Sequence, residues 1–136
     1  MLNPGNYSLC DTAITTAQAS IAQTPVQELD GILGVTVLTK FSYGSGGTSA
    51  KAYVQVSPDD GITWIDIASF AFTTVSAVKV VNFSGLTPVL APVLPNDGAL
   101  ADNTFLDGIL GSAMRVKLVT TGTYVGTVLS VKISVR

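Results

Sequence analysis

The chain has 136 residues, a mass of 14.0 kDa, a net charge of −2 and only 12% charged residues. It has no histidine and one cysteine, Cys10, which excludes an internal disulfide framework and the commonest catalytic triads and dyads. Its seven basic residues are scattered and no apolar run approaches the ~20 residues of a membrane helix, so neither nucleic acid nor membrane is an expected partner.

The composition favours β-structure. Val, Ile and Thr together account for 41 of the 136 residues, and β-branched side chains fit pleated strands better than helices. An average domain is about 25% charged, twice the value found here. Either Ser, Thr, Asn and Gly supply the solubilising groups instead of charges, or much of the surface is buried against partners rather than exposed to water.

The first third of the chain predicts two strands. Residues 1–11 lack periodicity and are expected to form an N-terminal arm, and Met1–Gly5 lacks the charged and apolar stretches of a secretory signal. Thr12–Ala22 is threonine-rich and is expected to be a strand. In Gly34–Tyr43, Val35, Val37, Phe41 and Tyr43 fall on one face and Thr36, Lys40 and Ser42 on the other, which is typical of a half-buried strand.

A hairpin is expected over residues 50–72. Residues 50–57 and 62–72 read as strands, and Pro58-Asp59-Asp60-Gly61 between them is a turn sequence. The stretch Ser57–Trp64 also fits the pattern S-x-D-x-G-x-T-W, the Asp-box, which is a structural hairpin turn in sialidases and other β-proteins. One copy of this motif implies no propeller and no activity.

The second half predicts further strands around a proline-rich segment. Residues 77–83 form a strand, whereas 86–95 contains three prolines, which remove ladder donors and exclude a central strand. Residues 103–110 could hold one helical turn. The chain then ends in two strands that place Met114, Val116 and Leu118, and later Leu129, Val131, Ile133 and Val135, on the inner face.

Together these elements predict an all-β fold with about seven or eight strands. An antiparallel two-sheet sandwich of jelly-roll type, formed by residues 1–136 as a single domain, fits best, and a small barrel is the alternative. A lone cysteine such as Cys10 most often packs as a small buried apolar side chain.

Carboxylates are the remaining groups with reactive chemistry. Asp59 and Asp60 lie in the expected turn and Asp66 in the following strand, so turn formation explains them better than a catalytic pair. Asp97, Asp102 and Asp107 recur near asparagines, but their spacing does not match a calcium-binding loop. We therefore expect no enzyme activity, no metal and no cofactor.

Residues 50–136 resemble a known family. The stretch Tyr53–Ala68, followed by Asp102-Asn103-Thr104, Gly111, Arg115-Val116-Lys117 and Gly122-Thr123-Tyr124, is similar to small virion proteins of tailed bacteriophages. The overall build resembles their jelly-roll capsid cement, or decoration, proteins. This resemblance implies a protein without an active site that binds the major capsid protein outside the capsid, associates with itself as a dimer or trimer, and is assembled into virions in the host cytoplasm.

Two segments without strand patterning are the candidate contact surfaces, namely the N-terminal arm and residues 86–95. Their candidate interface residues are Leu2, Tyr7, Leu9, Pro88, Val89, Leu90, Pro92, Val93 and Leu94. Two other functions stay open. One is a phage tail, neck or fibre component. The other is a carbohydrate-binding β-sandwich, which would need an exposed aromatic platform built from Tyr43, Tyr53, Trp64 or Tyr124.

Overall fold

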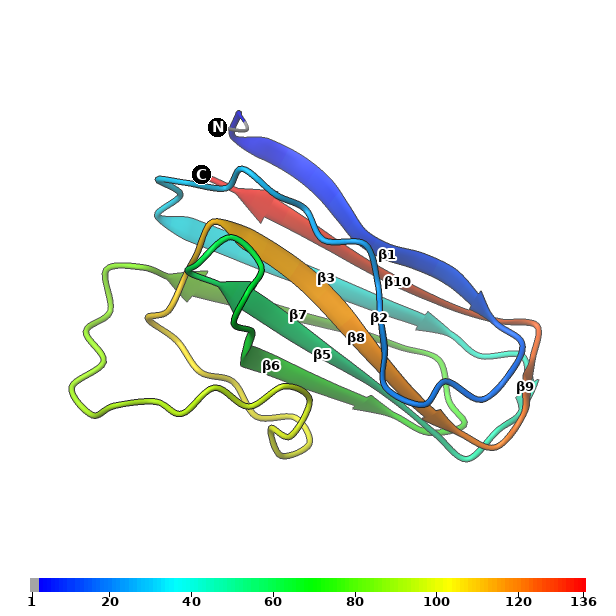
Figure 1. Cartoon of the computed structure of the whole chain (residues 1–136). Coiled ribbons are helices and arrows are strands. Elements are labelled where there is room, and N and C mark those ends of the chain that lie inside the picture. Colours follow the sequence, from blue (N-terminus) through cyan, green and yellow to red (C-terminus); the bar gives the residue numbers. More distant parts are fainter. Residues whose placement is uncertain (1–2) are drawn as a thin grey trace.

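The computed structural model describes residues 3–136, and the regular structure in this part of the chain is all β-strand (Figure 1). The strands are β1 (Gly5–Ile14), β2 (Ile21–Ala22), β3 (Gly34–Ser42), β4 (Ser45–Gly46), β5 (Ser49–Ser57), β6 (Ile65–Phe72), β7 (Ala77–Ser84), β8 (Ala113–Thr121), β9 (Tyr124–Val125) and β10 (Thr127–Val135).

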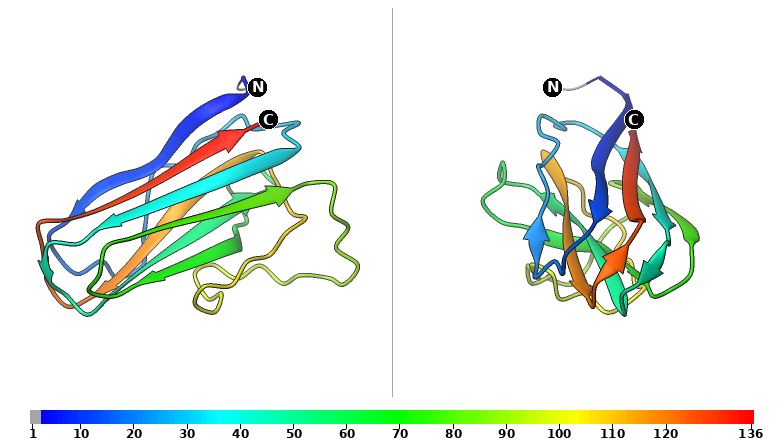
Figure 2. Two further views of the ribbon diagram at one scale, coloured as in Figure 1. Left: turned by 180° about the vertical axis from the view of Figure 1, so that it is seen from behind. Right: turned by 90° about the vertical axis from the view of Figure 1, so that its right-hand side faces the viewer.

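The strands form two antiparallel four-stranded sheets packed face to face (Figure 2). Sheet A has the order β1-β10-β3-β7 and sheet B the order β2-β8-β5-β6, while β4 and β9 pair separately at one end. Among the described residues, six of the seven connections between these eight strands cross between the sheets, and only β5–β6 stays within one. The two-sheet sandwich is therefore confirmed, and the jelly-roll type stays a prediction with which this winding is compatible.

The core lies between the sheets, where the alternating strands turn their apolar faces. In β3, Val35, Val37 and Phe41 are at most 2% exposed, and in β10 the four inward residues from Leu129 to Val135 are equally buried. The expected faces of both strands are thus confirmed. Val37 stands opposite Ile133 in the ladder, so a one-residue slip of either strand would expose its whole apolar face.

The expected hairpin over residues 50–72 is confirmed as β5 and β6, and the Asp-box closes it. The Ser57 hydroxyl donates to Asp59 Oδ1 at 2.8 Å and accepts the Gly61 N–H at 2.8 Å. Asp59 Oδ1 also accepts the Thr63 N–H at 2.7 Å, which lowers the pKa of this carboxyl below its ordinary value. Gly61 has a φ of 94°, in the region that glycine adopts without strain.

The expected N-terminal arm is wrong, because residues 5–14 form β1 and pair with β10 along its length. The ladder shifts between Ser8 and Cys10, so Leu9 is an extra residue and both Leu9 and Cys10 point into the core. This bulge breaks the alternation that a sequence pattern relies on. The expected burial of Cys10 is confirmed at 4% exposure.

Two other expected elements are also wrong. Thr12–Ala22 is not one strand, because β1 ends at Ile14 and β2 holds only Ile21 and Ala22. Residues 18–29 instead follow the edge of β8 through separate hydrogen bonds, such as Val26 N–H to the Met114 carbonyl at 2.8 Å. Residues 103–110 form no helical turn, since Phe105 bridges to Ala68 at the edge of β6.

The outer face of sheet B is covered by residues 96–107, called the strap here. Tyr53 and Gln55 alternate outward on β5, yet they are only 6% and 0% exposed. Asp97 of the strap bonds Gln55, and Asp102 pairs with Lys51 at 2.9 Å. The middle strand of sheet B is therefore buried on both faces, which its half-buried sequence pattern does not predict.

Replacing Ser57 with Ala should lower the free energy of unfolding by about 1–3 kcal/mol, because two hydrogen bonds of a buried hydroxyl are lost. Urea denaturation measures this change. Ser42→Ala, at an exposed position on β3, is the matched control and should stay within about 0.5 kcal/mol of the wild type. Equal stability of the two variants would show that the Asp-box does not hold the hairpin.

Candidate functional site

The most exposed apolar segment of the described chain is residues 86–95, called the arm here. Leu86, Leu90 and Leu94 are 74%, 94% and 78% exposed, and none of the ten residues is charged. The arm follows β7 and runs beyond the ends of the strands, away from the sandwich (Figure 2). Monomeric proteins rarely leave contiguous apolar surface uncovered, so the arm is a candidate contact surface.

The start of the arm is fixed by Asp107. Its carboxylate accepts the Ser84 N–H at 2.7 Å, the Thr87 hydroxyl at 3.0 Å and the Gly108 N–H at 2.8 Å. The hydrogen bond from the Ser84 backbone is the main reason that the pKa of Asp107 lies below its ordinary value. The ionised carboxylate thus holds the first residues of the arm against the end of β7.

The chain just after the arm is fixed by Asp66 of β6. This carboxylate is 2% exposed and accepts the consecutive N–H groups of Gly98, Ala99 and Leu100 at 2.8–3.1 Å. Gln55 donates its side-chain amide to the same carboxylate at 2.8 Å. A buried charge is tolerated when its acceptor sites are filled in this way.

Asp97 adds a second contact to the same region. It accepts from Lys117 Nζ at 2.9 Å and Arg115 Nη2 at 3.2 Å, and from the Gln55 amide at 2.8 Å. Partial burial raises the pKa of Asp97, but the bonds from Lys117 and Gln55 and the two cationic charges outweigh it, so this pKa lies below its ordinary value. Arg115 in turn stacks over the Trp64 ring, 4.2 Å from its centroid.

These anchors hold the arm out as a preformed loop. Its own residues make no hydrogen bond between 88 and 95 in the described structure, while the residues on either side are tied to β6, β7 and β8. Three prolines restrict the backbone further. A loop ordered before binding loses little conformational entropy when it meets a partner.

The candidate interface residues from the sequence divide accordingly. Pro88, Val89, Leu90, Pro92 and Leu94 are exposed on the arm and Val93 is half-buried there. Leu9 is 3% exposed in the core and offers no contact surface, and Tyr7 is half-buried on β1 with its hydroxyl bonded to the Asn3 carbonyl. Leu2 lies outside the described residues. The two candidate contact segments therefore differ. Residues 86–95 form an exposed loop, whereas residues 5–14 form a strand of sheet A.

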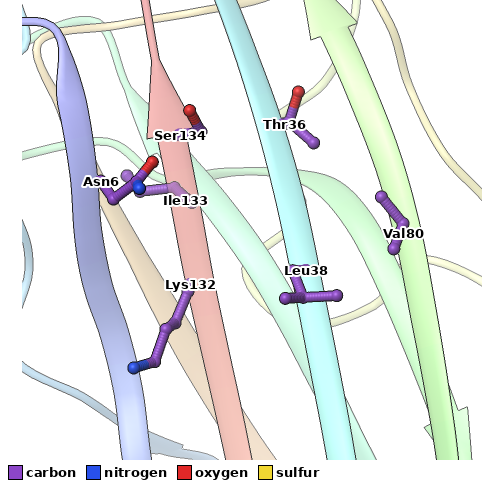
Figure 3. A pocket seen from close by; sticks show the side chains of 7 residues that line it. All are labelled: Asn6, Thr36, Leu38, Val80, Lys132, Ile133 and Ser134. Carbon is purple, nitrogen blue, oxygen red and sulfur yellow. The ribbon is translucent and has the colours of Figure 1, made fainter.

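A second apolar surface, on the outer face of sheet A, was not recognised in the sequence. Val78 and Val80 of β7 are 62% and 57% exposed, and Leu38 of β3 stands directly beside Val80. Leu38, Val80 and Lys132 line a groove of about 350 Å³ (Figure 3). The sequence does indicate this surface, because Val78 and Val80 on one face of β7 and Val81 on the other make the strand apolar on both faces.

The carboxylates expected to form turns do so or anchor the strap. Asp59 ties the Asp-box, Asp66 the strap, and Asp97, Asp102 and Asp107 each bind a different cation or backbone segment. Within residues 3–136 no three metal-ligating side chains gather into a group that could hold an ion. In the same range, no helix is long and apolar enough to cross a membrane.

The aromatic residues considered for a carbohydrate platform do not form one. Tyr124, Tyr53 and Trp64 are 1%, 6% and 9% exposed, and Tyr43 is half-buried with its ring edge-on to Tyr124. Tyr124 packs edge-on against Phe41 and donates its hydroxyl to the Thr73 carbonyl at 2.7 Å. These rings stabilise the sandwich and present no flat surface on which a sugar could stack.

Replacing Asp66 with Asn should lower the free energy of unfolding by about 1.5–3 kcal/mol, since a neutral amide accepts fewer and weaker bonds than the carboxylate. Amide exchange of residues 98–100 should accelerate more than that of β10. Urea denaturation and exchange measured by NMR test both effects. Unchanged exchange at these three amides would show that Asp66 does not anchor the strap.

Asp97→Asn should lose up to about 1 kcal/mol at pH 6, where Asp97 is ionised, because exposed ion pairs contribute modestly. The folded-state pKa of Asp97 is depressed, so its contribution is present above the unfolded pKa of about 3.9 and is lost as pH falls through the folded value. The stability difference between the two proteins in urea titrations should therefore shrink as the pH falls below the unfolded pKa of about 3.9. A difference that does not change as the pH is lowered would contradict the assignment.

Comparison of the chain with protein-family models, with curated protein sequences and with solved structures gives no match.

Proposed function

We propose that this chain is a structural virion protein that binds the outside of a phage capsid and cements neighbouring major capsid subunits. The observation that supports this most is the arm, which carries three exposed leucines and no charge on a preformed loop. Its partners are the major capsid protein and other copies of itself, and its location is the virion.

The chemistry of the rest of the molecule agrees with a contact role. The carboxylates most suited to catalysis are used as anchors, with Asp66 and Asp97 both committed to the strap. Three of the basic residues, Lys51, Arg115 and Lys117, are paired with acids, which leaves no continuous basic surface for nucleic acid in the described chain.

Cementing would arise from the apolar surface that many identical contacts together remove from water. Each apolar Å² removed from water contributes about 25 cal/mol, less the cost of immobilising the partner. A capsid repeats the same site many times, so contacts that are weak singly act together on the shell. A protein held in this way needs complementary apolar surface rather than reactive groups, which fits its low charge.

The abundance of the chain on virus particles tests this function. Particles sedimented from a lysate of the source should contain about one copy per one or a few major capsid subunits, as measured by quantitative mass spectrometry. A trace ratio would move the assignment to a tail, neck or fibre component. Absence from purified particles would contradict a virion role.

Leu90→Asp should weaken rebinding to particles stripped of this protein by about 10- to 100-fold, because burying a leucine is worth about 1.5–3 kcal/mol. Leu90 is 94% exposed, so the free energy of unfolding should not change. The matched control is Ile62→Asp, which alters an equally apolar and 84% exposed side chain in the Asp-box turn. Equal binding of both variants and the wild type would exclude the arm from the contact.

A further inference from the structure

The strap is held to sheet B in two different ways along its length. Its last part carries two backbone hydrogen bonds to β6, from the Ser69 N–H to the Thr104 carbonyl at 3.1 Å and from the Leu106 N–H to the Ile67 carbonyl at 2.8 Å. Residues 96–103 make no backbone bond to a strand in the described chain. Every hydrogen bond that ties this first part to the sheet involves a side chain.

Three carboxylates and one amide supply these bonds. Asp66 accepts the N–H groups of residues 98–100, while Asp97 and Asp102 pair with the cations opposite them. Asn103 Oδ1 accepts the Ala71 N–H at 3.2 Å and a proton of Lys79 Nζ at 2.9 Å. The titratable and charged side chains of the strands that face residues 96–103 are Lys51 and Tyr53 of β5, Asp66 of β6, Lys79 of β7, and Arg115 and Lys117 of β8.

The surface beneath the strap is polar, which is unusual for a covered strand face. Gln55, Asp66 and Ser69 are at most 2% exposed, and the Ser69 hydroxyl has no hydrogen-bond partner within the described chain. This hydroxyl would gain a bond to water if the cover lifted. Residues 96–103 contain one large apolar side chain, Leu100, and it is half-buried. Separating the two surfaces therefore gives up much less apolar burial than opening the core.

Acid removes the charges on which this closure depends. Protonation turns one oxygen of a carboxylate into a donor and ends its attraction to Lys and Arg. Partial burial raises the pKa of Asp97, but the bonds from Lys117 and Gln55 and the charges of Lys117 and Arg115 outweigh it and hold this pKa below its ordinary value. Such a carboxyl favours the closed strap above its free pKa of about 3.9, and this preference is lost as the pH falls through the depressed value.

We propose that residues 96–103 are a latch that is closed at neutral pH and that acid opens while the sandwich stays folded. The latch turns about the backbone bonds of Thr104 and Leu106, which contain no titrating group. Opening uncovers Tyr53, Gln55 and Ser69 and separates Lys51, Arg115 and Lys117 from the carboxylates of the strap. The outer face of sheet B thus becomes an open polar and cationic surface. This inference does not depend on the proposed function.

Amide hydrogen exchange of the full-length chain tests the latch. It is measured by NMR and expressed as protection relative to an unstructured peptide, which corrects for the pH dependence of exchange itself. Between about pH 7 and about pH 3 the amides of Gly98, Ala99 and Leu100 should lose about tenfold or more in protection, while those of Leu106 and β10 keep theirs. A common loss at all these amides, or unchanged protection at residues 98–100, would overturn the proposal.

Two double variants separate the latch from a general effect of charge. Asp97→Asn with Asp102→Asn removes two latch carboxylates and should lower the protection of residues 98–100 about three- to tenfold at pH 7, with β10 unchanged. Asp11→Asn with Asp30→Asn removes the same charge at exposed positions that make no bond to the strap in the described chain, and should match the wild type. Equal protection of residues 98–100 in the two variants, or a parallel loss in β10, would show that no separate latch exists.

Trp64, the single tryptophan of the chain, gives a second readout. Arg115 lies over its ring, 4.2 Å from the centroid, and also binds Asp97 of the latch at 3.2 Å. Because opening removes the Asp97 contact, the fluorescence of Trp64 should change on acidification before the far-ultraviolet circular dichroism of the strands is lost. One transition in which both signals change together would count against the latch.

Discussion

The carboxylate of Asp66 is the group on which the covered side of this molecule depends. It lies within β6 at 2% exposure and binds three consecutive N–H groups of the strap, more than thirty residues away in sequence. Because those bonds fill the acceptor sites of the buried carboxylate, release of the strap would break all of them and expose the outer face of sheet B to water. Sheet B is thereby sealed, its side chains Tyr53 and Gln55 are buried, and the arm is directed outward.

The edges of both sheets are closed to further strands, each in its own way. β1 carries a bulge at Leu9, β2 is two residues long, and the edge of β6 is occupied by Phe105 and its neighbours. On β7, Lys79 points inward, bonds the Ala71 carbonyl at 2.7 Å and lies over the Phe72 ring. Bulges, short strands and inward charges are the usual devices against edge-to-edge aggregation. The large exposed apolar side chains away from these edges include those of the arm and those of Val78 and Val80 on the outer face of sheet A.

The sequence predicts the fold well wherever one face of a strand is buried. The alternations in β3 and β10 and the Asp-box turn are local patterns, and the structure confirms all three. β1 escaped detection because its bulge shifts the alternation by one residue. The burial of Gln55 and Asp66 could not be predicted from the sequence pattern, because it depends on contacts with a strap that is distant in sequence. The three prolines were enough to indicate that residues 86–95 are not a strand. The exposure of this segment could not be predicted, because it depends on where Asp107, Asp66 and Asp97 hold the backbone on either side of it.

The anchors of the arm all lie outside the ten residues that it contains. Asp107, Asp97 and Asp66 hold the flanking backbone, and within the described chain Thr87 is the one residue between Leu86 and Pro95 whose side chain bonds any of them. The sequence of this segment can therefore diverge without disturbing the sandwich, so stability and recognition are set by separate parts of the chain. Relatives could acquire new partners by exchanging these residues alone, and the same segment is a natural position for grafting a foreign peptide.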